Sequence, residues 1–125
     1  MRTNNNESAE DYLETILILS KRLPAVRSID VANEMNFKKS SVSVAMKNLR
    51  NKDMITVTDA GYILLTEEGR ALAEMIYERH LFLSGWLEEL GIGPEQAVED
   101  ACRMEHDISP ESFAAIKKFV ESNRS

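Results

Sequence analysis

The run Cys102-Arg103-Met104-Glu105-His106 contains three residue types that bind transition metals. On a helix, positions i, i+3 and i+4 share one face, so we expect Cys102, Glu105 and His106 to converge on one point. Arg103 and Met104 would then point elsewhere. A thiolate, a carboxylate and an imidazole together suit a first-row transition metal. The run is also compatible with a structural role, because cysteine is often a buried small hydrophobe and Glu and His are common on helix surfaces.

A second group of possible ligands lies in other segments of the chain. Asp11 and Glu14 stand at i and i+3 of an expected N-terminal helix and can supply oxygen ligands, and His80 of a later helix adds an imidazole. The alternative for the acidic pair is a place near a helix N-terminus, which favours negative charge. The residues alone leave both interpretations open.

The charge of the chain is divided unevenly between its two halves. The net charge is -6, but residues 1–65 carry nine Lys and Arg against eight Asp and Glu, net +1, and residues 66–125 carry six against thirteen, net -7. The first half contains one stretch of five basic residues with no acidic residue among them, namely Lys38, Lys39, Lys47, Arg50 and Lys52. A surface that faces DNA phosphates needs such a local excess of positive charge. The other interpretation is a solvated helix face.

The basic stretch belongs to a segment with the pattern of a helix-turn-helix. Ser28 is the expected N-cap of a short helix, IDVANEM, and its core-facing residues are predicted to be Ile29, Val31, Ala32 and Met35. After a tight connection at residues 36–38, a second helix is predicted over residues 39–52, with its inward positions at Val42, Met46 (or Ala45) and Leu49. Small and basic side chains remain outside, as on a DNA-recognition helix.

We predict which side chains of this helix would contact DNA. The expected set is Lys38, Lys39, Ser40, Ser41, Ser43, Val44, Lys47 and Arg50. The residues from Lys39 to Val44 would face the major groove, and Lys47 and Arg50 would contact phosphates. Because Val44 donates no hydrogen bond and the serines are permissive, sequence discrimination is expected to rest partly on DNA shape.

The flanking segments complete a winged arrangement. The run EDYLETILILSKR predicts an N-terminal helix with Ser8 as N-cap and its end before Pro24. The run MITVTDAGYILLT predicts a β-hairpin that turns at Gly61, which would serve as a wing. Thr66 is expected to cap a long helix that Gly91 terminates.

The second half is predicted to be helical throughout. The apolar positions of the long helix are Leu72, Met75, Ile76, Leu83, Trp86, Leu87 and Leu90. They exceed what a domain of this size needs for its own core, which indicates a dimer interface formed by some of Leu72, Met75, Leu83, Trp86 and Leu87. Two shorter helices are expected, from Pro94 to about Asp107 and from Pro110, after Ser109, to about Ser122.

The fold class predicted from these elements is mainly α. A winged helix-turn-helix DNA-binding domain is expected over residues 1–66, followed by a helical metal-binding and dimerisation domain over residues 67–125. No apolar run is long enough to cross a bilayer, and the polar N-terminus does not resemble a secretory signal, so we expect a cytoplasmic protein with no membrane partner. Cys102 is the only cysteine and is expected to be a reduced thiol.

Five runs of the sequence resemble, in order, the diphtheria toxin repressor family of metal-activated transcriptional regulators. They are SAEDYLETI, the helix pair SIDVANEM and KKSSVSVAMKNL, GYILLTEEGR, IYERH and EDACRMEHDIS. The resemblance extends from about Ser8 to Phe119. It implies a winged-helix homodimeric repressor that binds operator DNA when Fe(II) or Mn(II) occupies a site joining the N-terminal helix to the dimerisation domain. The chain is similar to the short form without an SH3-like domain, as in the manganese transport regulators.

The resemblance also implies the ligands, and their types are mixed. The implied primary site comprises Asp11, Cys102, Glu105 and His106, with Glu14 and His80 as second-site or outer ligands. Iron-responsive members usually have Met where this chain has Asp11, and Cys where it has Cys102. Short manganese-responsive members have Asp and Glu at these two positions. In iron-responsive members, two ligands of the ancillary site would fall at the positions of Ser84 and Val98. This chain has neither an acid nor an imidazole there, so the resemblance implies that the ancillary site cannot form in its usual form. A site that accepts both Mn(II) and Fe(II) is therefore expected, with one or two ions per subunit.

Two other functions are considered. A metal-independent winged-helix regulator or adaptor would use Cys102 and His106 for core packing, and an absence of any metal effect on DNA affinity would identify it. A small metallohydrolase would use Glu105 as a base. The sequence has no HExxH pair, no glycine-rich phosphate loop and no nucleophile elbow, so we expect a protein that is not an enzyme.

Overall fold

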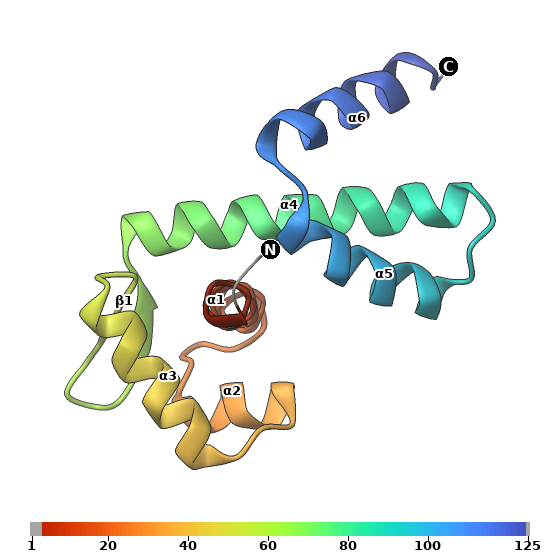
Figure 1. The fold of residues 1–125 in the computed structure, drawn as a ribbon. Coiled ribbons are helices and arrows are strands. Elements are labelled where there is room, and N and C mark those ends of the chain that lie inside the picture. Colours follow the sequence, from red (N-terminus) through yellow and green to blue (C-terminus); the bar gives the residue numbers. More distant parts are fainter. Residues whose placement is uncertain (1–3, 125) are drawn as a thin grey trace. The chain divides into compact units, whose positions relative to one another are not determined.

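The computed structural model describes residues 4–124, and these residues form six helices and one pair of strands (Figure 1). The elements are α1 (Asn4–Arg22), α2 (Ser28–Met35), α3 (Lys39–Asn51), β1 (Ile55–Val57), β2 (Ile63–Leu65), α4 (Glu67–Glu89), α5 (Pro94–Asp107) and α6 (Pro110–Ser122). The predicted mainly α class is confirmed. The chain divides into two compact units, one up to Met75 and one from Ile76, so α4 belongs to both. No helix of the described part is long and apolar enough to span a bilayer.

Helix α1 provides the centre of the first unit. Leu13, Ile16 and Leu17 are at most 1% exposed, as the i, i+3, i+4 spacing predicts. The helix begins at Asn4, so Ser8 lies inside it and the prediction of Ser8 as N-cap is wrong. The preceding asparagines and glutamate extend the helix without adding apolar periodicity, which is why the pattern could not locate this start.

Helix α2 begins at Ser28, one residue earlier than predicted, so Ser28 is not the N-cap. Arg27 occupies that position with extended backbone angles, and its N–H donates to the Asp30 carboxylate at 2.9 Å. Val31 and Ala32 are buried as expected, whereas Ile29 is 37% exposed and does not face the core. Asn36 takes a left-handed conformation (φ 58°) after the helix, and this residue turns the chain toward α3.

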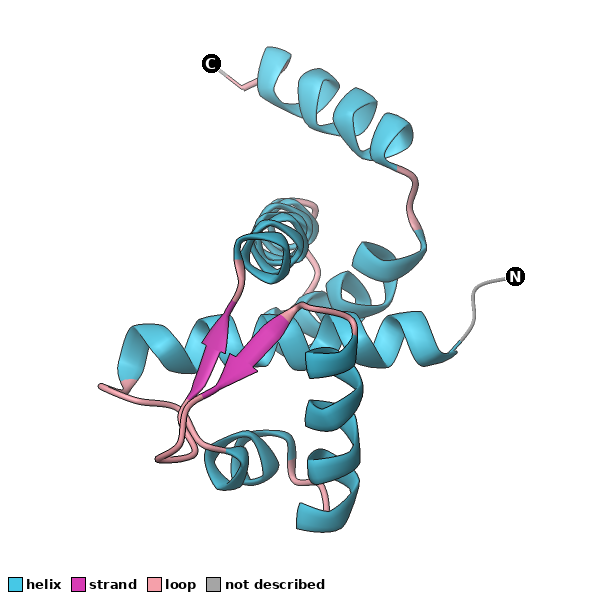
Figure 2. Cartoon of the chain, turned by 90° about the vertical axis from the view of Figure 1, so that its left-hand side faces the viewer, coloured by secondary structure: helices cyan, strands magenta, loops and turns pink. Residues whose placement is uncertain are grey.

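Helix α3 and the hairpin agree with the predictions. Val42, Met46 and Leu49 are buried, and Met46 rather than Ala45 fills the inward position. Figure 2 shows β1 and β2 as the antiparallel pair in magenta. In this pair, Thr56 lies opposite Leu64. Gly61 has φ 87° in the turn, where an L side chain would be strained, and its N–H donates to the carbonyl of Thr58.

Thr66 joins the hairpin to α4. Its hydroxyl accepts the N–H of Gly69 at 3.0 Å and donates to the carbonyl of Asp53 at 2.7 Å, which confirms it as the helix cap. A β-carbon on Gly69 would overlap the carbonyl oxygen of Met54, so only glycine allows this close approach. The start of α4 is therefore fixed against the segment that leads from α3 into β1.

The second unit packs α5 and α6 against the later part of α4. Leu83, Ala101 and Phe113 form its buried apolar cluster, one residue from each helix. Gly91 ends α4 as predicted: with φ 100°, it donates its N–H to the carbonyl of Glu88. Ser109 caps α6, because its hydroxyl accepts the N–H of Ser112 at 3.0 Å.

Candidate metal centre and nucleic-acid interface

Helix α5 places its possible ligands on a buried face. Glu105 and His106 are 0% and 1% exposed, and Cys102 is half-buried. Arg103 points away as the helical spacing predicts, and it pairs with Glu99 at 2.8 Å on the exposed face. The ligand atoms of Cys102 and His106 lie within 4.8 Å of each other. One turn of α5 thus presents a thiol, a carboxylate and an imidazole.

The Glu105 carboxylate lies near two imidazoles. Its Oε1 is 3.3 Å from Nδ1 of His80 on α4 and 4.0 Å from Nε2 of His106. Neither carboxylate oxygen accepts a hydrogen bond from any residue in the described part of the chain. A buried carboxylate without hydrogen bonds is costly unless a cation lies beside it. Carboxylate and imidazole donors in this arrangement fit a divalent first-row transition ion.

The donors of the second unit form two chemically different pairs. Cys102 and His106 combine a soft thiolate with an imidazole, whereas His80 and Glu105 combine a harder carboxylate with an imidazole. Thiolates favour Zn(II) and Fe(II), and carboxylates favour Mn(II). The structure brings these four predicted residues together within the second unit.

Asp11 and Glu14 lie on α1, in the first unit. They are one turn apart on the same helix face, Asp11 half-buried and Glu14 8% exposed. Because α1 begins at Asn4, both residues lie beyond its first turn. Stabilisation of charge by the helix dipole fades within that first turn, so it does not explain the position of these two acids.

The predicted DNA-contacting residues form an exposed surface on α3 and its N-cap. All eight are exposed, and Val44 reaches 62%. The first turn of α3 contains no acidic residue. A groove of about 260 Å³ is lined by Lys39 and Ser43 of α3 together with Ser28 and Ile29 of α2. The exposed Ile29 therefore belongs to this surface and not to the core.

Arg27 and Tyr62 are partners in the fold that the sequence did not predict. The Arg27 guanidinium lies 4.9 Å from the centre of the Tyr62 ring and donates to the Tyr62 hydroxyl at 3.3 Å. The contact joins the start of α2 to the turn end of the wing. The two residues are 35 positions apart, and no local pattern signals such a pairing.

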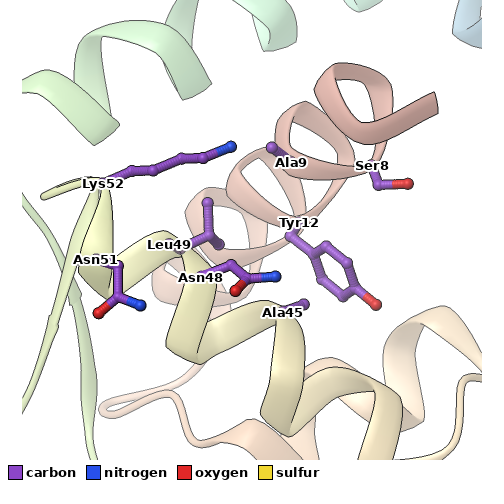
Figure 3. A pocket seen from close by; sticks show the side chains of 8 residues that line it. All are labelled: Ser8, Ala9, Tyr12, Ala45, Asn48, Leu49, Asn51 and Lys52. Carbon is purple, nitrogen blue, oxygen red and sulfur yellow. The ribbon is translucent and has the colours of Figure 1, made fainter. Parts of the chain in front are cut away.

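A second cavity of the first unit, about 320 Å³, opens between α1 and α3 (Figure 3). Figure 3 shows Tyr12 of α1 beside Asn48 of α3. Burial raises the pKa of the Tyr12 phenol, so this side chain stays neutral at physiological pH. Among the described residues that line it, uncharged groups dominate, Lys52 is the one charged side chain, and none is acidic.

Two family descriptions cover nearly the whole chain. Residues 6–61 match the N-terminal DNA-binding domain of iron-dependent repressors, and residues 66–125 match their metal-binding and dimerisation domain. The second matched segment begins at Thr66, the cap of α4.

Individual relatives agree with this assignment. The chain is 31% identical to the transcriptional regulator MntR of Escherichia coli over 120 residues, which are 96% of this chain and 77% of the relative. It is 32% identical to an uncharacterized HTH-type transcriptional regulator of Methanocaldococcus jannaschii, over 93% of this chain and 94% of that one.

Solved structures show the same fold. The manganese regulator SloR superposes with a TM-score of 0.80 at 28% identity, over 97% of this chain and 55% of that one. IdeR of T. acidophilum gives 0.72 at 27% identity, over 95% and 55%. The chain thus spans about half the length of these solved relatives. Together the two domain matches, the relatives and the fold establish that this chain belongs to the iron-dependent (diphtheria toxin) repressor family.

Proposed function

We propose that this protein is a metal-activated transcriptional repressor that binds operator DNA as a homodimer in the cytoplasm. The observation that carries the proposal is Glu105, a fully buried carboxylate that accepts no hydrogen bond in the described part and lies beside His80 and His106. The exposed basic face of α3 supplies the DNA-binding part of the same chain. Members of the family are regulators of transcription, which argues against an enzyme.

The proposed ligands come from three helices, α1 of the first unit and α4 and α5 of the second. Cys102, Glu105, His106 and His80 would bind Mn(II) or Fe(II) together with Asp11 and Glu14 of α1. A divalent ion supplies the positive charge that this largely anionic set of donors lacks. Without it, the carboxylates of α1 repel the carboxylate and thiolate of α5, which disfavours their approach.

The consequence for DNA binding follows from α1. This helix forms the centre of the DNA-binding unit. A metal ion that holds α1 to α5 would therefore also fix the position of the whole DNA-binding unit. Two recognition helices of a dimer could then match successive major grooves, about 34 Å apart. Because activation is a coupling of two binding events, operator DNA must raise metal affinity by the factor by which metal raises DNA affinity.

A metal titration of DNA binding tests the proposal. DNA fragments would first be selected from a random pool in the presence of Mn(II). Wild-type protein should bind these fragments when Mn(II) or, under anaerobic conditions, Fe(II) is added. A chelator should release them. His106→Ala should abolish the metal effect, because the loss of one imidazole leaves too few ligands to join the two units. Arg103→Ala, an exposed neighbour on α5, is the matched control and should behave as wild type.

Two results would contradict the proposal. Operator affinity that is the same with metal and with chelator would identify a metal-independent regulator, the alternative function. Full metal-dependent binding by His106→Ala would remove Cys102 and Glu105 from the metal site as well, since the assignment of the three residues rests on one shared helix face.

A further inference from the structure

Arg79 is a buried arginine directly before His80 on α4, and its hydrogen bonds go to the backbone of α5. Arg79 is only 5% exposed. Its Nη1 donates to the carbonyl of Glu105 at 3.1 Å and to the carbonyl of Ile108 at 3.0 Å. Arg79 thus satisfies carbonyl groups at the C-terminal end of α5, where a cation is favourable.

The guanidinium also connects the third helix of the unit. It lies 5.5 Å from the centre of the Phe113 ring of α6. In the described part of the chain, it forms no ion pair with a carboxylate, and its Nε has no hydrogen-bond partner. A buried guanidinium with an unsatisfied donor costs stability, and replacing such a group by an apolar residue is often harmless to a fold. A role beyond packing would account for its presence.

Two successive residues of α4 hold Glu105 at two points. Arg79 binds its backbone carbonyl, and His80 contacts its side chain, with 3.3 Å between Nδ1 and Oε1. The position of the Glu105 carboxylate is therefore determined by the backbone contact together with the side-chain contact. Cys102 lies one turn earlier on α5 and has no such contact with Arg79 among the described residues.

We infer that Arg79 is a positioning residue of the metal site, which acts through Glu105 and sets the affinity for the ion. This inference rests on the proposed function. Residues that orient ligands from behind typically contribute about 10- to 100-fold to metal affinity. Arg79→Met keeps much of the volume and removes both hydrogen bonds, so it should weaken Mn(II) binding by about that factor. Arg79→Lys, which keeps the charge but places its donor nitrogen on a shorter side chain than Nη1 of arginine, should fall between Arg79→Met and wild type.

A double-mutant cycle separates positioning from general loosening of the fold. Free Mn(II) would be measured by its solution EPR signal in wild type, Arg79→Met, Glu105→Gln, Cys102→Ser and the two double variants. If Arg79 acts through Glu105, its substitution should change affinity less than about twofold in the Glu105→Gln background and keep its full effect in the Cys102→Ser background. Arg103→Met is the control for the loss of an arginine from this region.

Spectra of the Co(II)-loaded protein give a second readout. Arg79→Met should change the ligand-field bands, which report coordination geometry, and leave the thiolate charge-transfer band of Cys102 in place. Equal losses in all backgrounds, or wild-type affinity in Arg79→Met, would overturn the inference. If Arg79→Met does not fold, the same cycle with Arg79→Lys decides. Wild-type protein that binds no Mn(II), Fe(II) or Co(II) would instead contradict the proposed function itself.

Discussion

Asp11 and Cys102 favour different metals. Carboxylate oxygen is a hard donor that suits Mn(II), whereas thiolate sulfur is softer and favours Fe(II) or Zn(II). Cys102→Glu should therefore shift the preference for activation toward Mn(II), and Asp11→Met should shift it toward Fe(II). The measurement is the ratio of the activating concentrations of Mn(II) and Fe(II) in anaerobic DNA-binding titrations. Ratios that move together in the two variants would show that these residues do not determine metal choice.

Lys47 tests the DNA-binding surface at the scale of one side chain. It is exposed on α3 and contacts no acidic residue in the described part of the chain. If it neutralises one phosphate, Lys47→Ala should weaken binding to all sequences alike and reduce the slope of log affinity against log salt by about one. An unchanged slope would exclude a phosphate contact. Lys118→Ala, an exposed lysine of α6, is the control.

The shared face of the candidate ligands on α5 could be predicted because their spacing is local, and the contact of Arg79 with this helix could not. Cys102, Glu105 and His106 share a helix face by periodicity alone. The contact of Arg79 with Glu105 depends on how α4 packs against α5, 26 residues further along the chain. The same reason explains why the pairing of Arg27 with Tyr62 appears only in the folded unit.

At the scale of elements, the predictions succeeded where a local side chain determines a boundary. Thr66 and Gly91 occupy the cap positions expected of them, because a hydroxyl cap and a glycine in the left-handed region act through bonds within one turn. The predictions failed at Ser8 and Ser28. There the helix either began earlier or was capped through Arg27 and Asp30, and a serine alone does not distinguish these possibilities.

Gly69 provides a test of how α4 is joined to the hairpin. Gly69→Ala forces a methyl group against the Met54 carbonyl, so we expect the free energy of unfolding to fall by about 1–3 kcal/mol. Gly85→Ala is the matched control on the same helix, because a β-carbon there meets nothing within 4 Å. Gly85→Ala should leave the free energy of unfolding unchanged or raise it by about 0.5–1 kcal/mol. Denaturant unfolding of the metal-free protein measures both, and equal effects would refute the close approach.

At the scale of the whole molecule, the single-chain structure corrects the expected dimer interface. Leu83 is 0% exposed and belongs to the core of its own unit, so it cannot supply interface area as the sequence suggested. Trp86 and Leu87 also pack partly against that core. On α4, Met75 and Leu81 remain 39% and 53% exposed and are better candidates, because large apolar side chains at that exposure lose contact with water only in an assembly.

Leu81 therefore provides the test of the dimer. We expect wild-type protein at micromolar concentration to sediment as twice the 14.2 kDa chain, and Leu81→Asp to weaken dimerisation at least about tenfold, since it would place a charge in an apolar interface. Leu64→Asp is the matched control, because Leu64 on the wing has nearly the same exposure, 54%, but lies in the DNA-binding unit. A dimer that survives Leu81→Asp would place the interface elsewhere. A 14.2 kDa species both with and without metal would exclude the homodimer, and with it the binding of two recognition helices to successive major grooves.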